Sequence, residues 1–323
     1  MPSAQQNTSQ DAVEVYPRFK IFALSAGVVA LCFVLPLWEL ARFALRVDLY
    51  SYVILVPFIS GWLLWQKREH IEKATVTGRR WALLPSALGL ALLAWYWTQK
   101  TAPPGNGRND WLAAVILAFL CFVWSASLWL LGSRGFARGA FPLLFLLFMV
   151  PLPLAVESGI ERFFQYHSAW ATHLLLKISG TPVFRDGTLF QVPGFAFDIA
   201  PECSGIRSNL VLFMTGLIAG HLFLRRPWAR AAIAGAVIVI GIFRNATRIF
   251  TLAQLCIHVD PEMIHSPLHR RGGPLFFVLS LIPLFLMLWW LRRQETRADR
   301  RAAAADSSSV LQPKRRRAEI PGR

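Results

Sequence analysis

The segment 198–209 places a thiol among charged and polar side chains at the edge of an apolar run. It reads Asp-Ile-Ala-Pro-Glu-Cys-Ser-Gly-Ile-Arg-Ser-Asn, and the residues that follow, Leu210–Met214, predict the start of a buried helix. Cys203 is therefore expected where a loop enters a membrane span. The partial positive charge of a helix N-terminus, together with Arg207, favours the thiolate over the thiol. The segment thus predicts a nucleophile at Cys203.

A second group of polar residues interrupts the end of a later apolar run. Arg244, Asn245 and Arg248 lie in that run, and Asn245 and Arg248 share one helix face because they are three residues apart. An arginine inside a membrane costs roughly 2.5–3.5 kcal/mol on insertion scales, which makes it a candidate for function. His269 lies in the loop before the last apolar run. The order of the spans predicts that Cys203, Arg248 and His269 reach the same side of the membrane.

These residue types suit acyl transfer. Cys203 would be the nucleophile, His269 the general acid and base, and Arg248 the charge that stabilises a thiolate or an oxyanion. Arg207 could replace or assist Arg248. The alternative, in which Arg248 extends to lipid headgroups and His269 is an ordinary loop residue, stays open on these grounds alone.

The composition predicts a polytopic membrane protein. Of the 323 residues, 55% are hydrophobic and 16% are charged, whereas soluble domains carry about 25% charged residues. The net charge of +16 lies mostly between and after the apolar runs, so it indicates contact with anionic lipid rather than nucleic acid. The first apolar run lacks an Ala-x-Ala-like cleavage site, so we expect a retained anchor.

Eight apolar runs predict about eight transmembrane helices in an all-α fold, since about 20 residues cross a bilayer core. Residues 1–20 are expected to form a polar tail, 21–292 the multi-span domain and 293–323 a basic, disordered tail. The second run holds Pro57, which favours a kinked or re-entrant element, and Pro151 and Pro153 should bend or end the fifth. The runs are 21–38, 52–66, 81–98, 111–132, 139–156, 203–224, 229–251 and 274–291.

The distribution of Lys and Arg predicts the orientation. The loops that follow the second, fourth and sixth runs, together with the tail, hold more of these residues than the other loops. By the positive-inside rule both termini are cytoplasmic, and the candidate site faces the extracytoplasmic side. The long outside segment 157–202 is expected to begin with an amphipathic helix that ends at Gly180. Short extended pieces around the Asp186-Gly187 turn then deliver Cys203 to the membrane edge.

The other cysteines and histidines give no strong metal pattern. Cys32, Cys121 and Cys256 lie in or near spans, where a free cysteine is usually a small hydrophobe. His265 and His269 are four apart, but Pro267 breaks the helix that would align them. We expect neither a metal nor another cofactor.

In the identity and order of these residues the chain resembles the exosortase/archaeosortase family. The most specific element is Glu202-Cys203-Ser204-Gly205-Ile206-Arg207-Ser208. It is followed by Asn245-Ala246-Thr247-Arg248-Ile249 and by His269, four residues before Gly273. Further matching stretches are residues 48–52, 55–57, 142–145, 149–153, 167–169, 174–175, 180–183 and 187.

The resemblance implies a membrane cysteine transpeptidase with Cys203 as nucleophile and with Arg248 and His269 completing the site. We expect Arg207 and Asn245 to support the site or to bind substrate. It also implies membrane-anchored protein substrates in the plasma (inner) membrane. Their C-terminal signal would hold a motif such as Pro-Glu-Pro, a transmembrane helix and a basic tail, and an unidentified acceptor would release the product. Gly273-Pro274 and Ala246-Thr247 depart from the family's more usual residues and leave the subfamily open. Two alternatives remain: a small-molecule transporter, and a non-catalytic assembly factor for envelope polysaccharide or protein export.

Overall fold

The fold is that of an all-α polytopic membrane protein. A computed structural model describes residues 17–99, 108–260, 263 and 273–310, and the chain divides into two compact units, Met1–Ser158 and Gly159–Arg323. In the described part, six helices are long and apolar enough to cross a membrane, and up to eight spans result if two bent helix pairs count as one span each. The predicted fold class is confirmed.

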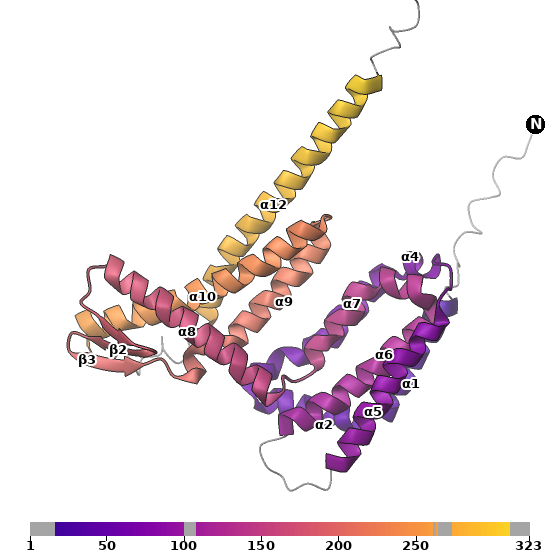
Figure 1. Cartoon of the computed structure of the whole chain (residues 1–323), viewed down its shortest axis with the longest axis horizontal. Helices are drawn as coiled ribbons and strands as arrows, with labels where there is room; N and C mark the ends of the chain where they lie inside the picture. The colour runs from indigo at the N-terminus through magenta and orange to yellow at the C-terminus, as the bar shows by residue number, and fades with distance from the viewer. Residues whose placement is uncertain (1–16, 100–107, 261–262, 264–272, 311–323) are drawn as a thin grey trace, which may run out of the picture. The chain divides into compact units, whose positions relative to one another are not determined.

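Unit 1 (Met1–Ser158) is built from helices that pack around the long helix α6. Its α1 and α5 lie against α6, whereas α3 packs against α7 (Figure 1). The elements are α1 (Pro17–Cys32), α2 (Val34–Arg46), η1 (Asp48–Leu55), α3 (Val56–Gln66), α4 (Arg68–Glu72), η2 (Arg79–Ala82), α5 (Leu83–Gln99), α6 (Arg108–Arg138), α7 (Ala140–Phe145) and η3 (Leu146–Met149).

The first apolar run does not form the continuous span that was expected. The chain breaks at Phe33, and α1 and α2 meet at an angle of 77°. Pro36 supplies a reason, because it has no N–H for the carbonyl of Cys32 and its ring clashes with that carbonyl in a continuous helix.

The two prolines of the fifth run end a helix, as predicted. η3 ends at Met149, and the next helix, α8 (Leu154–Ile178), begins directly after Pro153. The carboxylate of Asp110 accepts a hydrogen bond from the backbone N–H of Leu154 at 2.8 Å, and Glu157 accepts one from the hydroxyl of Tyr50 at 2.7 Å. These contacts fix the start of α8 against α6 and η1.

Unit 2 (Gly159–Arg323) holds a packed group of three helices and a small sheet. Leu212, Ile233 and Leu284 are fully buried between α9, α10 and α12. A Cβ at Gly216 would lie 2.6 Å from Val237 Cγ2, so the absence of a side chain permits close approach of α9 and α10. Besides most of α8, the unit contains β1 (Phe184–Asp186), β2 (Leu189–Val192), β3 (Phe195–Asp198), η4 (Pro201–Ser204), α9 (Ile206–Phe223), α10 (Pro227–His258) and α12 (Gly273–Val310).

The predicted extended pieces form a three-stranded antiparallel sheet in the order β1-β2-β3 (Figure 1). Phe190 of β2 is fully buried in a cluster with Leu176 of α8 and with Ile249 and Ala253 of α10. The sheet is thereby attached to α8 and to the C-terminal half of α10, and β3 leads directly into the segment that carries Cys203.

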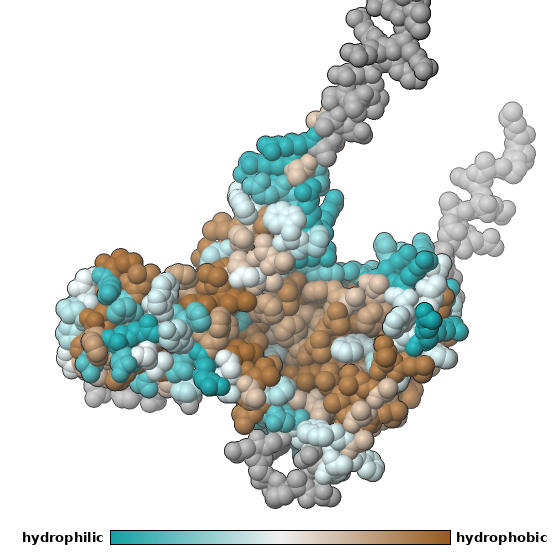
Figure 2. Space-filling view, in the orientation of Figure 1, coloured by the Kyte–Doolittle hydropathy of each residue, from teal (hydrophilic) through white to brown (hydrophobic). Residues whose placement is uncertain are grey.

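Helix α12 is longer than its apolar part. The sequence predicts disorder from residue 293, but the structure continues the helix to Val310. The added residues are mostly Arg, Ala, Glu and Gln, which favour helix. Figure 2 shows hydrophilic residues over this C-terminal part of α12.

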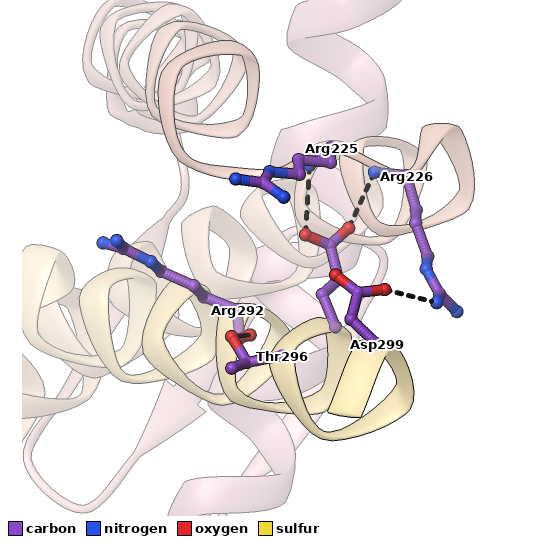
Figure 3. A network of polar contacts seen from close by, with 6 residues as sticks. Arg225, Arg226, Arg292, Thr296 and Asp299 are labelled. Atoms are coloured by element: carbon purple, nitrogen blue, oxygen red, sulfur yellow. Dashed lines mark hydrogen bonds and ion pairs between the residues drawn. The ribbon is translucent and has the colours of Figure 1, made fainter. Parts of the chain in front are cut away.

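Polar contacts hold α12 to the connection between α9 and α10 (Figure 3). The carboxylate of Glu295, which is 5% exposed, accepts hydrogen bonds from the backbone N–H groups of Arg225 and Arg226 at 3.0 and 2.7 Å. The guanidinium of Arg226 also pairs with Asp299 at 3.0 Å. Glu295 thus satisfies two N–H groups at the turn between two membrane helices.

Candidate active site

The turn that carries Cys203 connects the sheet to a membrane helix. β3 ends at Asp198, η4 spans Pro201–Ser204, and the N–H of Cys203 donates to the carbonyl of Ala200 at 2.8 Å. Gly205 has φ +72° and precedes the first residue of α9. L-residues rarely adopt this left-handed conformation, so glycine is the residue suited to this turn. Cys203 is half-buried at the entry to the helix, where the sequence places it.

Cys203 and Arg248 line the same cavity, which has a volume of about 70 Å³. β3 contributes Phe195, Phe197 and Asp198 to its wall, and α10 contributes most of the rest. The walls are largely apolar. A thiol and a half-buried guanidinium are therefore brought together in a small, mostly apolar site.

Asn245 holds the backbone of the turn. It is 1% exposed, and its side-chain Nδ2 donates to the carbonyl oxygens of Cys203 and Ser204 at 2.9 and 3.2 Å. Asn245 lies on the same helix as Arg248, three residues earlier. One helix, α10, therefore supplies both the guanidinium of Arg248 in the cavity and the side-chain amide of Asn245, which holds the backbone of Cys203.

A second pair of residues, Arg244 and Asn209, supports the same turn. Arg244 is 9% exposed, and its Nη2 donates to Asn209 Oδ1 at 3.0 Å and to the carbonyl of Gly205 at 3.3 Å. Sequence reasoning recognised Arg244 as an interruption of the apolar run but gave it no role. Two features of the sequence could have indicated this role: Arg244 lies directly before Asn245, and the polar residue Asn209 lies one helical turn after Gly205.

The remaining predicted site residues have different outcomes. Arg207 is exposed in the first turn of α9 and does not line the cavity of Cys203. His269 lies outside the described residues, as do His265 and Pro267. Cys256, interpreted above as a small hydrophobe, lines the same cavity as Cys203. Among the described residues, no group of three or more His, Cys, Asp or Glu side chains could hold a metal ion.

The comparison with known families decides the classification. The sequence model described as transmembrane exosortase matches residues 38–286. The chain belongs to the transmembrane exosortase family. The matched region of this exosortase includes the Cys203 turn and Arg248, and it ends before the hydrophilic part of α12. No curated protein and no solved structure matches the chain.

Proposed function

We propose that this exosortase is a membrane cysteine peptidase and transpeptidase that cleaves C-terminal sorting signals from exported, membrane-anchored proteins. The observation that carries the proposal is the shared cavity of Cys203 and Arg248, at the point where the chain enters a membrane helix. Family membership supports the class of reaction and the Pro-Glu-Pro-type signal.

The first chemical step would form a thioester. The proton of the Cys203 thiol passes to His269, and the Sγ thiolate attacks the carbonyl carbon of the scissile peptide bond. Arg248 stabilises the negative charge that develops on the carbonyl oxygen. The C–N bond then breaks, and the departing amine takes a proton, for which His269 is the proposed donor. The substrate remains bound to Cys203 as an acyl-enzyme.

The second step would release the substrate. An acceptor nucleophile attacks the thioester carbonyl, its proton is removed by His269, and the thiolate leaves. An acceptor other than water makes the reaction a transpeptidation, whereas water makes it a hydrolysis. Asn245 would keep the attacking sulfur in place in both steps, since it holds the carbonyl groups of Cys203 and Ser204.

The setting of this reaction also belongs to the proposal. We place the enzyme in the plasma (inner) membrane with both termini in the cytoplasm and the cavity on the extracytoplasmic side, because Lys and Arg are concentrated in the alternate loops and the tail. Residues 1–20 and the end of the chain beyond the apolar part of α12 would be cytoplasmic. Residues 157–202 would form the extracytoplasmic segment of the domain 21–292.

The test compares processing of a co-expressed membrane protein that carries a Pro-Glu-Pro-type C-terminus. Wild-type enzyme, Cys203→Ala and Cys256→Ala are brought to equal membrane abundance. Cys256→Ala is the matched control, because Cys256 lines the same cavity. Processing should be lost in Cys203→Ala and retained in Cys256→Ala. Equal processing by wild type and Cys203→Ala would refute the thiol mechanism and favour a non-catalytic assembly role.

A further inference from the structure

The candidate active-site cavity lies beside the part of α10 that extends beyond α9. A Cβ at Gly216 of α9 would lie 2.6 Å from Val237 of α10. Seven residues earlier in α9, Asn209 accepts a hydrogen bond at 3.0 Å from Arg244, which lies seven residues later in α10. The helices are therefore antiparallel, and the start of α9, three residues before Asn209, is level with Thr247. The residues of α10 that follow Thr247 extend beyond α9.

The thiol lies at one end of this cavity. The α10 wall of the cavity begins at Arg248 and continues for five residues to Ala253, or about 7.5 Å at 1.5 Å per residue. Asn245, whose amide donates to the carbonyl of Cys203 at 2.9 Å, precedes that wall by three residues. From Cys203 the cavity therefore extends away from the paired length of α9 and α10, toward the end of α10 that packs against the sheet.

The walls of the cavity leave room for a small apolar group. On the sheet side, Phe197 is held in place because its ring stacks on the rings of Phe190 and Phe195, with centroids 5.2 and 5.6 Å apart. On the helix side, Leu252 and Ala253 are both buried. A cavity of about 150 Å³ in an apolar protein interior holds benzene. The volume here is about 70 Å³, roughly half of that, so about three carbon atoms fit.

We propose that this cavity binds the side chain of the substrate residue that precedes the scissile bond, and that it selects a small apolar side chain such as that of valine. The inference rests on the proposed peptidase function. The carbonyl of that residue must reach the Sγ of Cys203, so its side chain is next to the cavity that begins there. A phenylalanine side chain is larger than the available space.

The direction of the cavity assigns it to this side of the scissile bond. The proposed substrate is anchored by a C-terminal transmembrane helix, so the residue after the bond leads toward the membrane and the residue before it leads away. The cavity also extends from Cys203 away from the paired membrane helices. It therefore follows the part of the substrate that stays on the enzyme as the thioester.

The experiment measures processing of the co-expressed membrane-anchored substrate, after mass spectrometry of the released protein has identified the cleaved bond. The residue before that bond is changed to valine or to phenylalanine. Wild-type enzyme should process the valine substrate at least about tenfold faster, since even one methylene group in an apolar pocket changes selectivity roughly 10–200-fold. The same exchange at the residue after the bond should change the rate much less.

Two enzyme variants test the helix-side wall. Leu252→Ala enlarges the cavity, so the preference for valine over phenylalanine should fall about tenfold or more. Ile238→Ala is the matched control, because Ile238 is an exposed apolar residue of the same helix and does not line the cavity. Ala253→Val narrows the cavity, so an alanine substrate should gain over the valine substrate. Each preference is a ratio of two rates from one preparation, so it does not depend on the amount of folded enzyme.

The outcomes separate this inference from the proposed function. Processing that requires Cys203 but has equal rates for the valine and phenylalanine substrates would overturn the inference alone. An unchanged preference in Leu252→Ala would do the same. Processing of no substrate by wild type, or processing that persists in Cys203→Ala, would overturn the proposed function and this inference with it.

Discussion

Replacing Asn245 by leucine tests whether the backbone of the Cys203 turn must be held for activity. Leucine has the same branched arrangement of heavy atoms but cannot donate, so the carbonyls of Cys203 and Ser204 lose hydrogen bonds of 2.9 and 3.2 Å. Two such bonds contribute about 1–3 kcal/mol of net stability. A displacement of about 1 Å in a reacting group can lower a rate roughly 100-fold. Asn245→Leu should therefore reduce activity far more than it reduces folding.

The assay measures the rate of signal cleavage and the thermal unfolding of the same membrane preparations. We expect a fall in processing of about 100-fold, with a folded protein of slightly lower melting temperature. Thr247→Val is the matched control, because exposed Thr247 lies on the same helix and its hydroxyl donates within α10 to the carbonyl of Phe243. A processing rate for Asn245→Leu within twofold of wild type would refute the positioning argument.

Three further predictions concern other contacts of unit 2. Arg248→Met should reduce processing at least about 100-fold. Arg248→Lys should retain part of the activity, since it keeps the positive charge but not the planar guanidinium with its paired N–H donors. Equal rates in Arg248→Met and wild type would exclude an electrostatic role. Gly205→Ala should lower stability by about 1–3 kcal/mol, because its φ is +72° and a Cβ would lie 2.8 Å from a guanidinium nitrogen. In thermal unfolding, Gly194→Ala, with φ +90° but no atom near its Cβ, should lose less stability, and the reverse order would contradict this. Glu295→Leu should make α12 more sensitive to limited proteolysis, since two backbone N–H groups lose their acceptor, and unchanged cleavage would disprove that attachment.

Cys203 and Arg248, which line one cavity, could be singled out from the sequence because unusual residues in an apolar setting are informative. A guanidinium in a membrane helix is unfavourable enough to mark Arg248, and the combination of Cys203 with Gly205 marks a turn at a helix start. The amphipathic helix and the strands around Asp186-Gly187 were predicted from periodicity and turn chemistry. The role of His269 stays a prediction.

The remaining features depend on tertiary contacts that a single sequence does not specify. Periodicity shows that Asn209 and Arg244 lie on helices, but not that these helices place the two side chains 3.0 Å apart. The break at Phe33 was not predicted, because a sequence alone does not show whether Pro36 kinks a helix or ends it. The basic composition after residue 293 is compatible with disorder or with helix, and the buried contact of Glu295 favours helix.

The contact between Glu295 and the α9–α10 connection also has a consequence for biogenesis. Glu295 follows Arg225 and Arg226 by 70 and 69 residues. At a synthesis rate of about 5–20 residues per second, a ribosome needs roughly 4–14 s to reach it. The hairpin itself is complete once α10 ends at His258, 37 residues before Glu295, so for roughly 2–7 s of that interval the finished hairpin has connecting N–H groups that lack their acceptor. Helix α12 therefore completes the unit only after the residues of the Cys203 turn have been translated. A nascent chain that stops before Glu295 would present a hairpin with unpaired N–H groups to membrane quality-control proteases.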